Sequence, residues 1–185
     1  VLISAGATNN TVGGTSTNAR NLISGNDSEG IRISGAGTNG NLVQANLVGT
    51  NISGSVALGN RLTGIVIADG AQNNQIGAIS PFRNIISGNG PTGLGILITD
   101  PGTQNNVVLG NLIGTNFVGN ASLGNQDNGI SITNSASNNT IGGITPGSGN
   151  VISGHSPVVL NGSNGWGITI TSTVGGNSVF GNLIG

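Results

Sequence analysis

The sequence predicts an all-β fold, a parallel β-helix (solenoid) of six coils with three short strands each. Three short sequence signals each occur six times, always in the same order along the chain. Successive copies of the first signal are 30 to 38 residues apart. Such a period is typical of repeat architectures, in which each unit buries its apolar face only against its neighbours.

The first signal is an aliphatic–any–aliphatic triplet. In a strand, successive side chains point to opposite faces, so the outer two residues of a triplet face one side and the middle residue the other. Stacked triplets therefore predict continuous inward columns of Val, Leu and Ile. The six triplets are Val1–Ile3, Ile31–Ile33, Ile65–Ile67, Ile96–Ile98, Ile130–Ile132 and Ile168–Ile170.

The second and third signals each begin with asparagine. In one, Asn is followed two residues later by Val or Ile, at Asn10, Asn41, Asn74, Asn106, Asn139 and Asn177. In the other, Asn precedes two aliphatic residues, at Asn21, Asn46, Asn84, Asn111, Asn150 and Asn182. Asn tolerates the left-handed backbone of sharp corners, and stacked amides donate to one another. We therefore predict two structural Asn ladders.

Two types of coil alternate along the chain. The second and fourth coils carry an extra loop before the next triplet, at residues 50–60 and 115–125. The complete repeat is therefore a pair of coils of about 65 residues. Residues 1–185 are predicted to form one solenoid domain, as a segment of a longer solenoid or a unit that stacks head to tail.

The composition excludes several classes of function. The chain has nine charged residues, a net charge of −1 and no cysteine. No basic patch is available to bind nucleic acid, and no run of about 18 apolar residues predicts membrane insertion. No motif predicts a cofactor or a metal site. Among the few charges, Arg61 and Asp27 occupy equivalent positions on neighbouring coils and are predicted to pair.

Phrases such as Asn111-Leu112-Ile113-Gly114-Thr115 and Asn150-Val151-Ile152-Ser153-Gly154 resemble those of parallel β-helix repeat proteins. These are right-handed solenoids of the pectate-lyase-like superfamily, and the resemblance is to long secreted or surface proteins of bacteria and archaea. It covers the whole chain and implies a right-handed helix and an extracellular or cell-surface location. The superfamily includes polysaccharide lyases, hydrolases, adhesins and structural fibres, so the resemblance leaves function open.

Asp69 and Asp100 are the best candidates for catalysis. Both stand four residues after the first Ile of a triplet, on adjacent coils, so their carboxylates should lie close together. Such a pair suits acid chemistry on a polysaccharide or a weak calcium site. The structural alternative is a turn column that they share with Gly35 and Asn134. We favour the turn, and we expect that the chain is not an enzyme.

One segment departs from the repeat. His155 stands where the frame expects Asn, and an apolar loop follows with Val158, Leu160 and the single Trp166. This segment is a candidate platform for stacking against a sugar or for contact with another subunit. The structural alternative is a longer loop that folds onto the flank of the solenoid.

The leading functional hypothesis is structural. Neither Val1–Ile3 nor Asn182–Gly185 resembles the polar cap that normally protects the open end of a solenoid. We expect a segment or subunit of an extracellular surface fibre that assembles end to end. The alternatives are a carbohydrate-binding adhesin module, which would use the two extra loops and the 155–166 segment, and a polysaccharide-cleaving enzyme.

Overall fold

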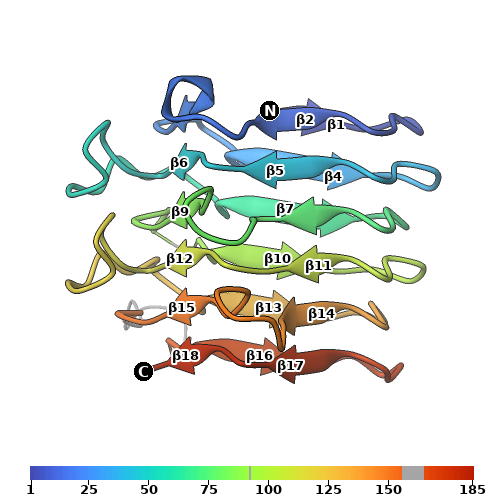
Figure 1. Cartoon of the computed structure of the whole chain (residues 1–185). Coiled ribbons are helices and arrows are strands. Elements are labelled where there is room, and N and C mark those ends of the chain that lie inside the picture. The colour runs from blue at the N-terminus through green and yellow to red at the C-terminus, as the bar shows by residue number, and fades with distance from the viewer. Residues whose placement is uncertain (92, 156–164) are drawn as a thin grey trace.

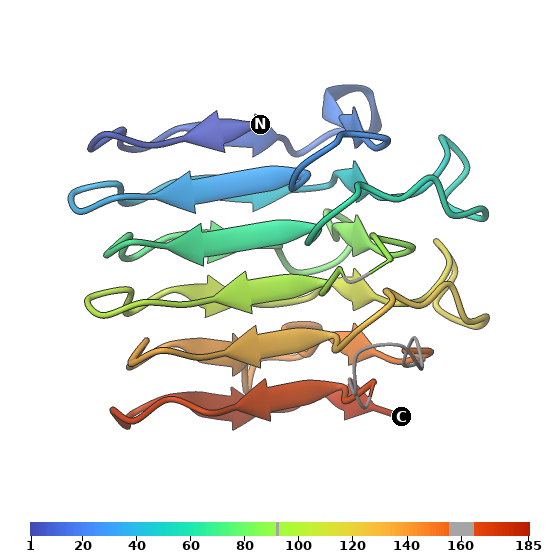
Figure 2. The same cartoon turned by 180° about the vertical axis from the view of Figure 1, so that it is seen from behind.

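The computed structural model confirms the parallel β-helix and describes residues 1–91, 93–155 and 165–185. Its six coils stack along one axis, as Figures 1 and 2 show from opposite sides. Within the described residues, eighteen strands form three parallel sheets of six, and each sheet takes every third strand. The only helical element described is a short 3-10 turn, η1 (Thr17–Ala19). No helix in this part of the chain is long and apolar enough to cross a membrane.

Sheet A consists of the six triplets. Its strands pair in register, so that Ile31 lies opposite Ile65 and Ile65 opposite Ile96. The strands are β1 (Leu2–Ile3), β4 (Ile31–Ser34), β7 (Ile65–Ala68), β10 (Ile96–Ile98), β13 (Ile130–Ile132) and β16 (Ile168–Ile170).

Sheets B and C are formed by the residues that follow the two predicted Asn columns. Sheet B contains β2 (Thr11–Gly13), β5 (Leu42–Gln44), β8 (Gln75–Ile76), β11 (Val107–Val108), β14 (Thr140–Gly142) and β17 (Ser178–Phe180). Sheet C contains β3 (Leu22–Ile23), β6 (Leu47–Val48), β9 (Ile85–Ile86), β12 (Leu112–Ile113), β15 (Val151–Ile152) and β18 (Leu183–Ile184).

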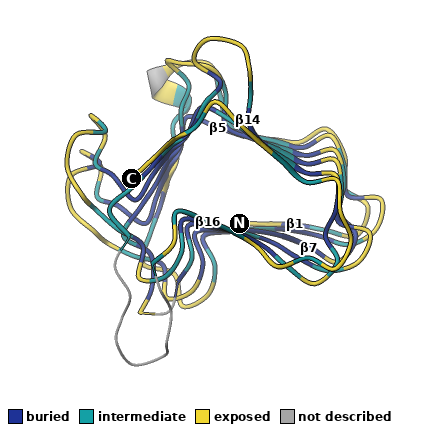
Figure 3. Ribbon diagram, turned by 90° about the horizontal axis from the view of Figure 1, so that it is seen from below, coloured by how far each residue is buried: buried dark blue, intermediate teal, exposed yellow. Residues whose placement is uncertain are grey.

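The core lies inside the three sheets, which form the sides of a prism when the molecule is viewed along its axis (Figure 3). Aliphatic side chains from all three sheets make one continuous cluster, with Ile67, Ile76 and Ile113 fully buried. A second, smaller cluster lies on the outer face of sheet C, where Leu47, Ile85 and Leu112 are also buried. Sheet C therefore needs cover on its outer face as well.

Both predicted Asn ladders are present. In the first, the Nδ2 group of Asn41 donates to Oδ1 of Asn74 at 2.8 Å, and Asn74 donates to Asn106 at 3.1 Å. The second Nδ2 hydrogen bonds a carbonyl of the preceding coil, as Asn74 does to Thr38. Each Oδ1 also accepts the backbone N–H of the ladder residue before it. A buried amide is thus satisfied on every side.

A third ladder was not predicted. Asn26 donates to Asn60, Asn60 to Asn89 and Asn89 to Asn125, at 2.6 to 2.9 Å. It runs along the corner that leads from sheet C back to sheet A. Its sequence signal is a Gly-Asn pair without the aliphatic residues that mark the other two columns. His155 follows Gly154 at the next position of this column.

The extra loops are two hairpins that project from sheet C on the second and fourth coils (Figures 1 and 2). Each is closed by one antiparallel bridge, between Thr50 and Ala57 and between Thr115 and Ser122. The hairpins meet across the third coil, where the N–H of Phe117 donates to the carbonyl of Gly54 at 2.9 Å. Together they cover the outer aliphatic cluster.

Replacing Asn74 with Leu tests the ladder. The change removes both donors and the acceptor of a fully buried amide, and it leaves Asn41 Nδ2 and Thr38 O without these partners. We expect a loss of about 1–3 kcal/mol in the free energy of unfolding for each group left unpaired. Denaturant titration measures it.

Asn73→Gly is the matched control. Asn73 is exposed, precedes the ladder residue and has φ of 55°, which glycine adopts freely. The free energy of unfolding should change by less than about 1 kcal/mol. Equal losses in the two variants would contradict a stabilising role for the ladder.

Candidate functional site

Asp69 and Asp100 do lie on adjacent coils, next to one another in one turn column. The backbone N–H of Asp69 donates to Oδ2 of Asp100 at 3.3 Å. Both residues have positive φ, 56° and 79°, as do Gly35 and Asn134 in the same column. Asp, Asn and Gly are the residues that tolerate this backbone best. The turn therefore explains why Asp is tolerated at both positions, and a catalytic role for them stays an untested prediction.

Asp69 forms an ion pair with Arg32 that was not predicted from the sequence. Arg32 contacts Oδ2 of Asp69 at 2.9 Å and Oε1 of Glu29 at 3.4 Å. Hydrogen bonding from Ser28 is the largest cause that lowers the pKa of Glu29, and Arg32 lowers it further. The predicted pair of Arg61 and Asp27 is wrong, because both ion pairs of the described residues involve Arg32. Nor does that part of the chain gather three metal-binding side chains in one place.

His155 points inward at the end of the third ladder. Its Nε2 atom lies against the backbone of Gly114 and Gly129. Neither imidazole nitrogen has a hydrogen-bond partner within the described residues, and both are shielded from solvent. Burial lowers the pKa of His155, while the backbone at Asn125 and Ile113 and the charge of Asp127 raise it by less. The histidine is therefore neutral where the other coils have an amide.

The rest of the predicted binding platform is only partly described. The side chain of Trp166 is 57% exposed, and its backbone N–H donates to Oδ1 of Asn128 at 2.7 Å. Val158 and Leu160 lie outside the described residues. The platform of His155, Val158, Leu160 and Trp166 stays a prediction, although His155 itself is turned toward the core.

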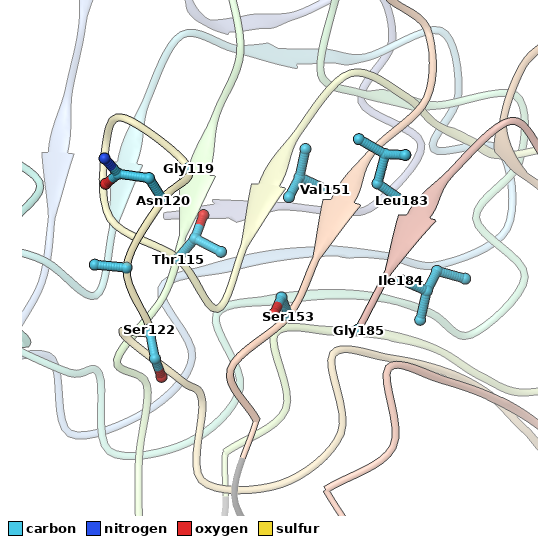
Figure 4. A pocket seen from close by; sticks show the side chains of 10 residues that line it. Thr115, Gly119, Asn120, Ser122, Val151, Ser153, Leu183, Ile184 and Gly185 are labelled. Atoms are coloured by element: carbon cyan, nitrogen blue, oxygen red, sulfur yellow. The ribbon is translucent and has the colours of Figure 1, made fainter.

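A groove of about 410 Å³ lies between the second hairpin and the last two strands of sheet C (Figure 4). Gly119 and Asn120 form its hairpin side, and Val151 and Leu183 form its floor. The side chain of Leu183 is 70% exposed. Its counterpart two coils earlier, Leu112, is buried beneath the second hairpin. The groove is therefore a place where the outer aliphatic column has lost its cover.

The two end coils expose further apolar surface. At one end Val1, Leu2 and Leu22 are exposed, and at the other Val179, Phe180 and Ile184 are exposed. The inward positions of the middle coils are covered by a coil on each side, and the outward counterparts of Leu22 on the second and fourth coils are covered by the hairpins. Both ends thus present strand edges without a neighbouring coil and exposed apolar side chains.

The geometry defines a parallel β-solenoid protein with three sheets, three amide ladders and a pair of flank hairpins. Comparison of the chain with protein-family models, curated proteins and solved structures finds no match.

Protonation of His155 should destabilise the fold. Its pKa in the folded state is below the ordinary value of 6.5, so its contribution to stability is complete above pH 6.5 and declines as the pH falls through the folded value. We expect the free energy of unfolding to fall from pH 7.5 to pH 5.5, by up to about 1.4 kcal/mol per pH unit. Denaturant titration at several pH values measures this slope.

His155→Asn is the control, since it removes the only histidine and extends the ladder by one amide. The variant should be more stable at pH 7 by about 1 kcal/mol and should lose the slope over this window. Parallel pH profiles for the two proteins would show that His155 does not titrate in the core.

The double variant Asp69→Asn, Asp100→Asn separates the turn from catalysis. Asn also tolerates positive φ, and the exposed pair with Arg32 is worth under about 1 kcal/mol. We expect wild-type stability, whereas Asp69→Val should cost about 1–3 kcal/mol because a β-branched residue is strained at φ of 56°. If the wild type cleaves a polysaccharide and the double variant does not, turn geometry alone does not explain the presence of Asp69 and Asp100.

Proposed function

We propose that this chain is a structural element of an extracellular fibre or stalk, a solenoid that is continued at its ends by further coils of the same kind. The observation on which this rests is the polarity of the Asn ladders. Every amide-to-amide hydrogen bond of the first ladder runs in the same direction, from a coil nearer the N-terminus to the next coil toward the C-terminus. The two ends of the molecule are therefore chemically different.

The ends are also complementary. At the N-terminal end the Oδ1 atoms of Asn10 and Asn21 have no coil above them to donate a bond. At the C-terminal end Asn177 and Asn182 each use one Nδ2 hydrogen on a backbone carbonyl, and the other has no further coil to reach. A coil like the first, placed beneath the last, would receive these donors in the same geometry as the interior rungs.

The apolar surfaces support the same arrangement. Ile3 and Ile23 at one end and Ile168 and Ile184 at the other belong to columns that are continuous through the core. Burying such aliphatic surface is worth about 25 cal/mol per Å². With nine charged residues in the whole chain, axial contact meets little electrostatic repulsion. Further coils of one chain, or a second copy, would supply the same cover.

Membership of the pectate-lyase-like superfamily and location outside the cell are parts of this proposal that rest on the resemblance of the repeats. The proposal has no catalytic step, because turn geometry explains Asp69 and Asp100. A carbohydrate-binding adhesin module is the second candidate, favoured by the exposed side chain of Trp166. A glycan array with Trp166→Ala as its control tests that candidate.

End-to-end assembly predicts fibres that grow from the purified protein. Electron microscopy and sedimentation velocity over a range of concentrations should show axial rods, in which each copy adds six rungs or about 29 Å. The variant Leu183→Lys, Ile184→Lys places two charges on the end coil and should give monomers only, because charges buried without partners are costly.

Ile144→Lys is the matched control. Ile144 is 91% exposed on the flank of the fifth coil, so a lysine there should leave assembly unchanged, and Ile184→Lys alone, which also adds one charge, should still prevent it. A wild-type protein that stays monomeric at high concentration would refute stacking of separate copies. Electron microscopy of the native material would then test the other form of the proposal, in which one longer chain supplies the coils.

A further inference from the structure

A second cavity lies on the outer face of sheet C and extends from Arg20 of the first coil to the second hairpin. Its volume is about 290 Å³, near the lower limit for small-molecule sites. Ile85 and Leu112 form its floor, and Phe117 and Val118 of the second hairpin form one wall. Val118 is 72% exposed and Phe117 is 47% exposed, so the wall is an apolar surface that the fold does not cover.

Two arginines line the same cavity, and the two-coil repeat places them there. Arg20 and Arg83 occupy the same position of the first and third coils, directly before ladder residues Asn21 and Asn84. The second coil has the small Ala45 at this position. The backbones of Arg20 and Arg83 are two strand spacings, or about 10 Å, apart. Their long side chains can therefore approach one another, because the small Ala45 lies between them.

Contacts on both sides fix the side chain of Arg20. Its Nε–H donates to the carbonyl of Ala45 at 3.0 Å. Its guanidinium carbon lies 5.0 Å from the centre of the Phe117 ring, within the range of a cation–π contact. The hydrogen bond to Ala45 uses one of the five N–H donors of the Arg20 guanidinium. The other four donors are available for a ligand at the cavity.

Arg83 has no comparable partner. Its Nε atom is shielded from solvent and has no hydrogen-bond partner within the described residues. Neither Arg83 nor Arg20 forms an ion pair there, since both ion pairs involve Arg32. A shielded donor without an acceptor is costly, and two adjacent cations without an anion add repulsion. Two of the four arginines of the chain are thus left uncompensated at one cavity.

We propose that this cavity binds a carboxylate carried on an apolar or aromatic body. The planar forks of Arg20 and Arg83 match the two oxygens of a carboxylate. The apolar body would rest against Phe117 and Val118, the exposed apolar residues of the cavity, above the buried Ile85 and Leu112. A neutral ligand would leave the arginines unpaired, and an inorganic anion would leave the apolar wall of Phe117 and Val118 uncovered. The site therefore requires both halves of the ligand.

Phenylacetate is the probe that tests this chemistry. A titration of the ¹⁵N-labelled protein should shift the side-chain Nε–H resonances of Arg20 and Arg83 in a saturable way. Phenylacetamide, which lacks the charge, and acetate and inorganic phosphate, which lack the ring, should each bind at least about tenfold more weakly. Equal binding of phenylacetate and phenylacetamide would overturn the proposal, as would the absence of any shift.

Variants locate the effect. Arg83→Gln and Arg20→Gln should each weaken phenylacetate binding by about tenfold, and Phe117→Leu should weaken it by a smaller factor. Arg61→Gln is the matched control, because Arg61 lies outside this cavity and should leave the affinity unchanged. Amide spectra establish that each variant is folded. Wild-type affinity in folded Arg83→Gln and Arg20→Gln proteins would refute the site.

The carboxylate has two possible sources, a free small molecule or the C-terminus of another protein. A short peptide that ends in phenylalanine, compared with its C-terminal amide, distinguishes them. Binding of the free acid but not the amide supports a protein terminus, and binding of phenylacetate without the peptide supports a small molecule. Arg20 belongs to the first coil and also borders the N-terminal end, so Arg83→Gln on the third coil is the variant whose effect on binding is independent of assembly through the end coils.

Discussion

The structure depends on parallel strands that stack in register, one coil above the next. Stacking at one strand spacing, about 4.8 Å, brings chemically equivalent side chains into contact. For Ile and Val that contact builds a continuous apolar column, and for Asn it builds a chain of amide hydrogen bonds. A strand of two residues such as β9 has no stability alone, because its inward side chain is covered only by its neighbours. The stability of each coil therefore depends on the coils directly above and below it.

The ladders give the solenoid a direction that an aliphatic core does not. A column of Ile has no preference between its two ends, whereas an Asn column has acceptors at one end and donors at the other. The same polarity that satisfies each buried amide leaves amide oxygens at one terminal coil and amide hydrogens at the other without a ladder partner. The amide hydrogen bonds between stacked Asn residues therefore stabilise the middle coils and also leave each end coil able to bind a further coil.

The sequence predicted the rungs well because their signals are local and repeated. The triplets of sheet A and two Asn columns are visible in any two coils, and the structure confirms them. The third ladder was missed because Asn26, Asn60, Asn89 and Asn125 share only a preceding glycine, which is common in a chain with 36 glycines. The pair of Arg61 and Asp27 was wrongly predicted from position in the repeat alone. Arg32 has a carboxylate on its own coil and on the next, so the charges are arranged differently.

Departures from the repeat are the features that periodicity does not explain. A residue that recurs on every coil, such as the ladder residue Asn74, is required by the stack, and the positive φ of Asp69 explains why its column holds only residues that tolerate this backbone. His155 replaces an amide and brings a titratable group into the core. Arg20 and Arg83 recur on two odd coils, whereas the corresponding residue of the fifth coil is Gly149. The stack requires neither a guanidinium nor a cavity there. The scaffold holds Arg20 through Ala45 and Phe117, whereas the unpartnered Nε of Arg83 at the same cavity is the feature that the proposed carboxylate ligand would explain.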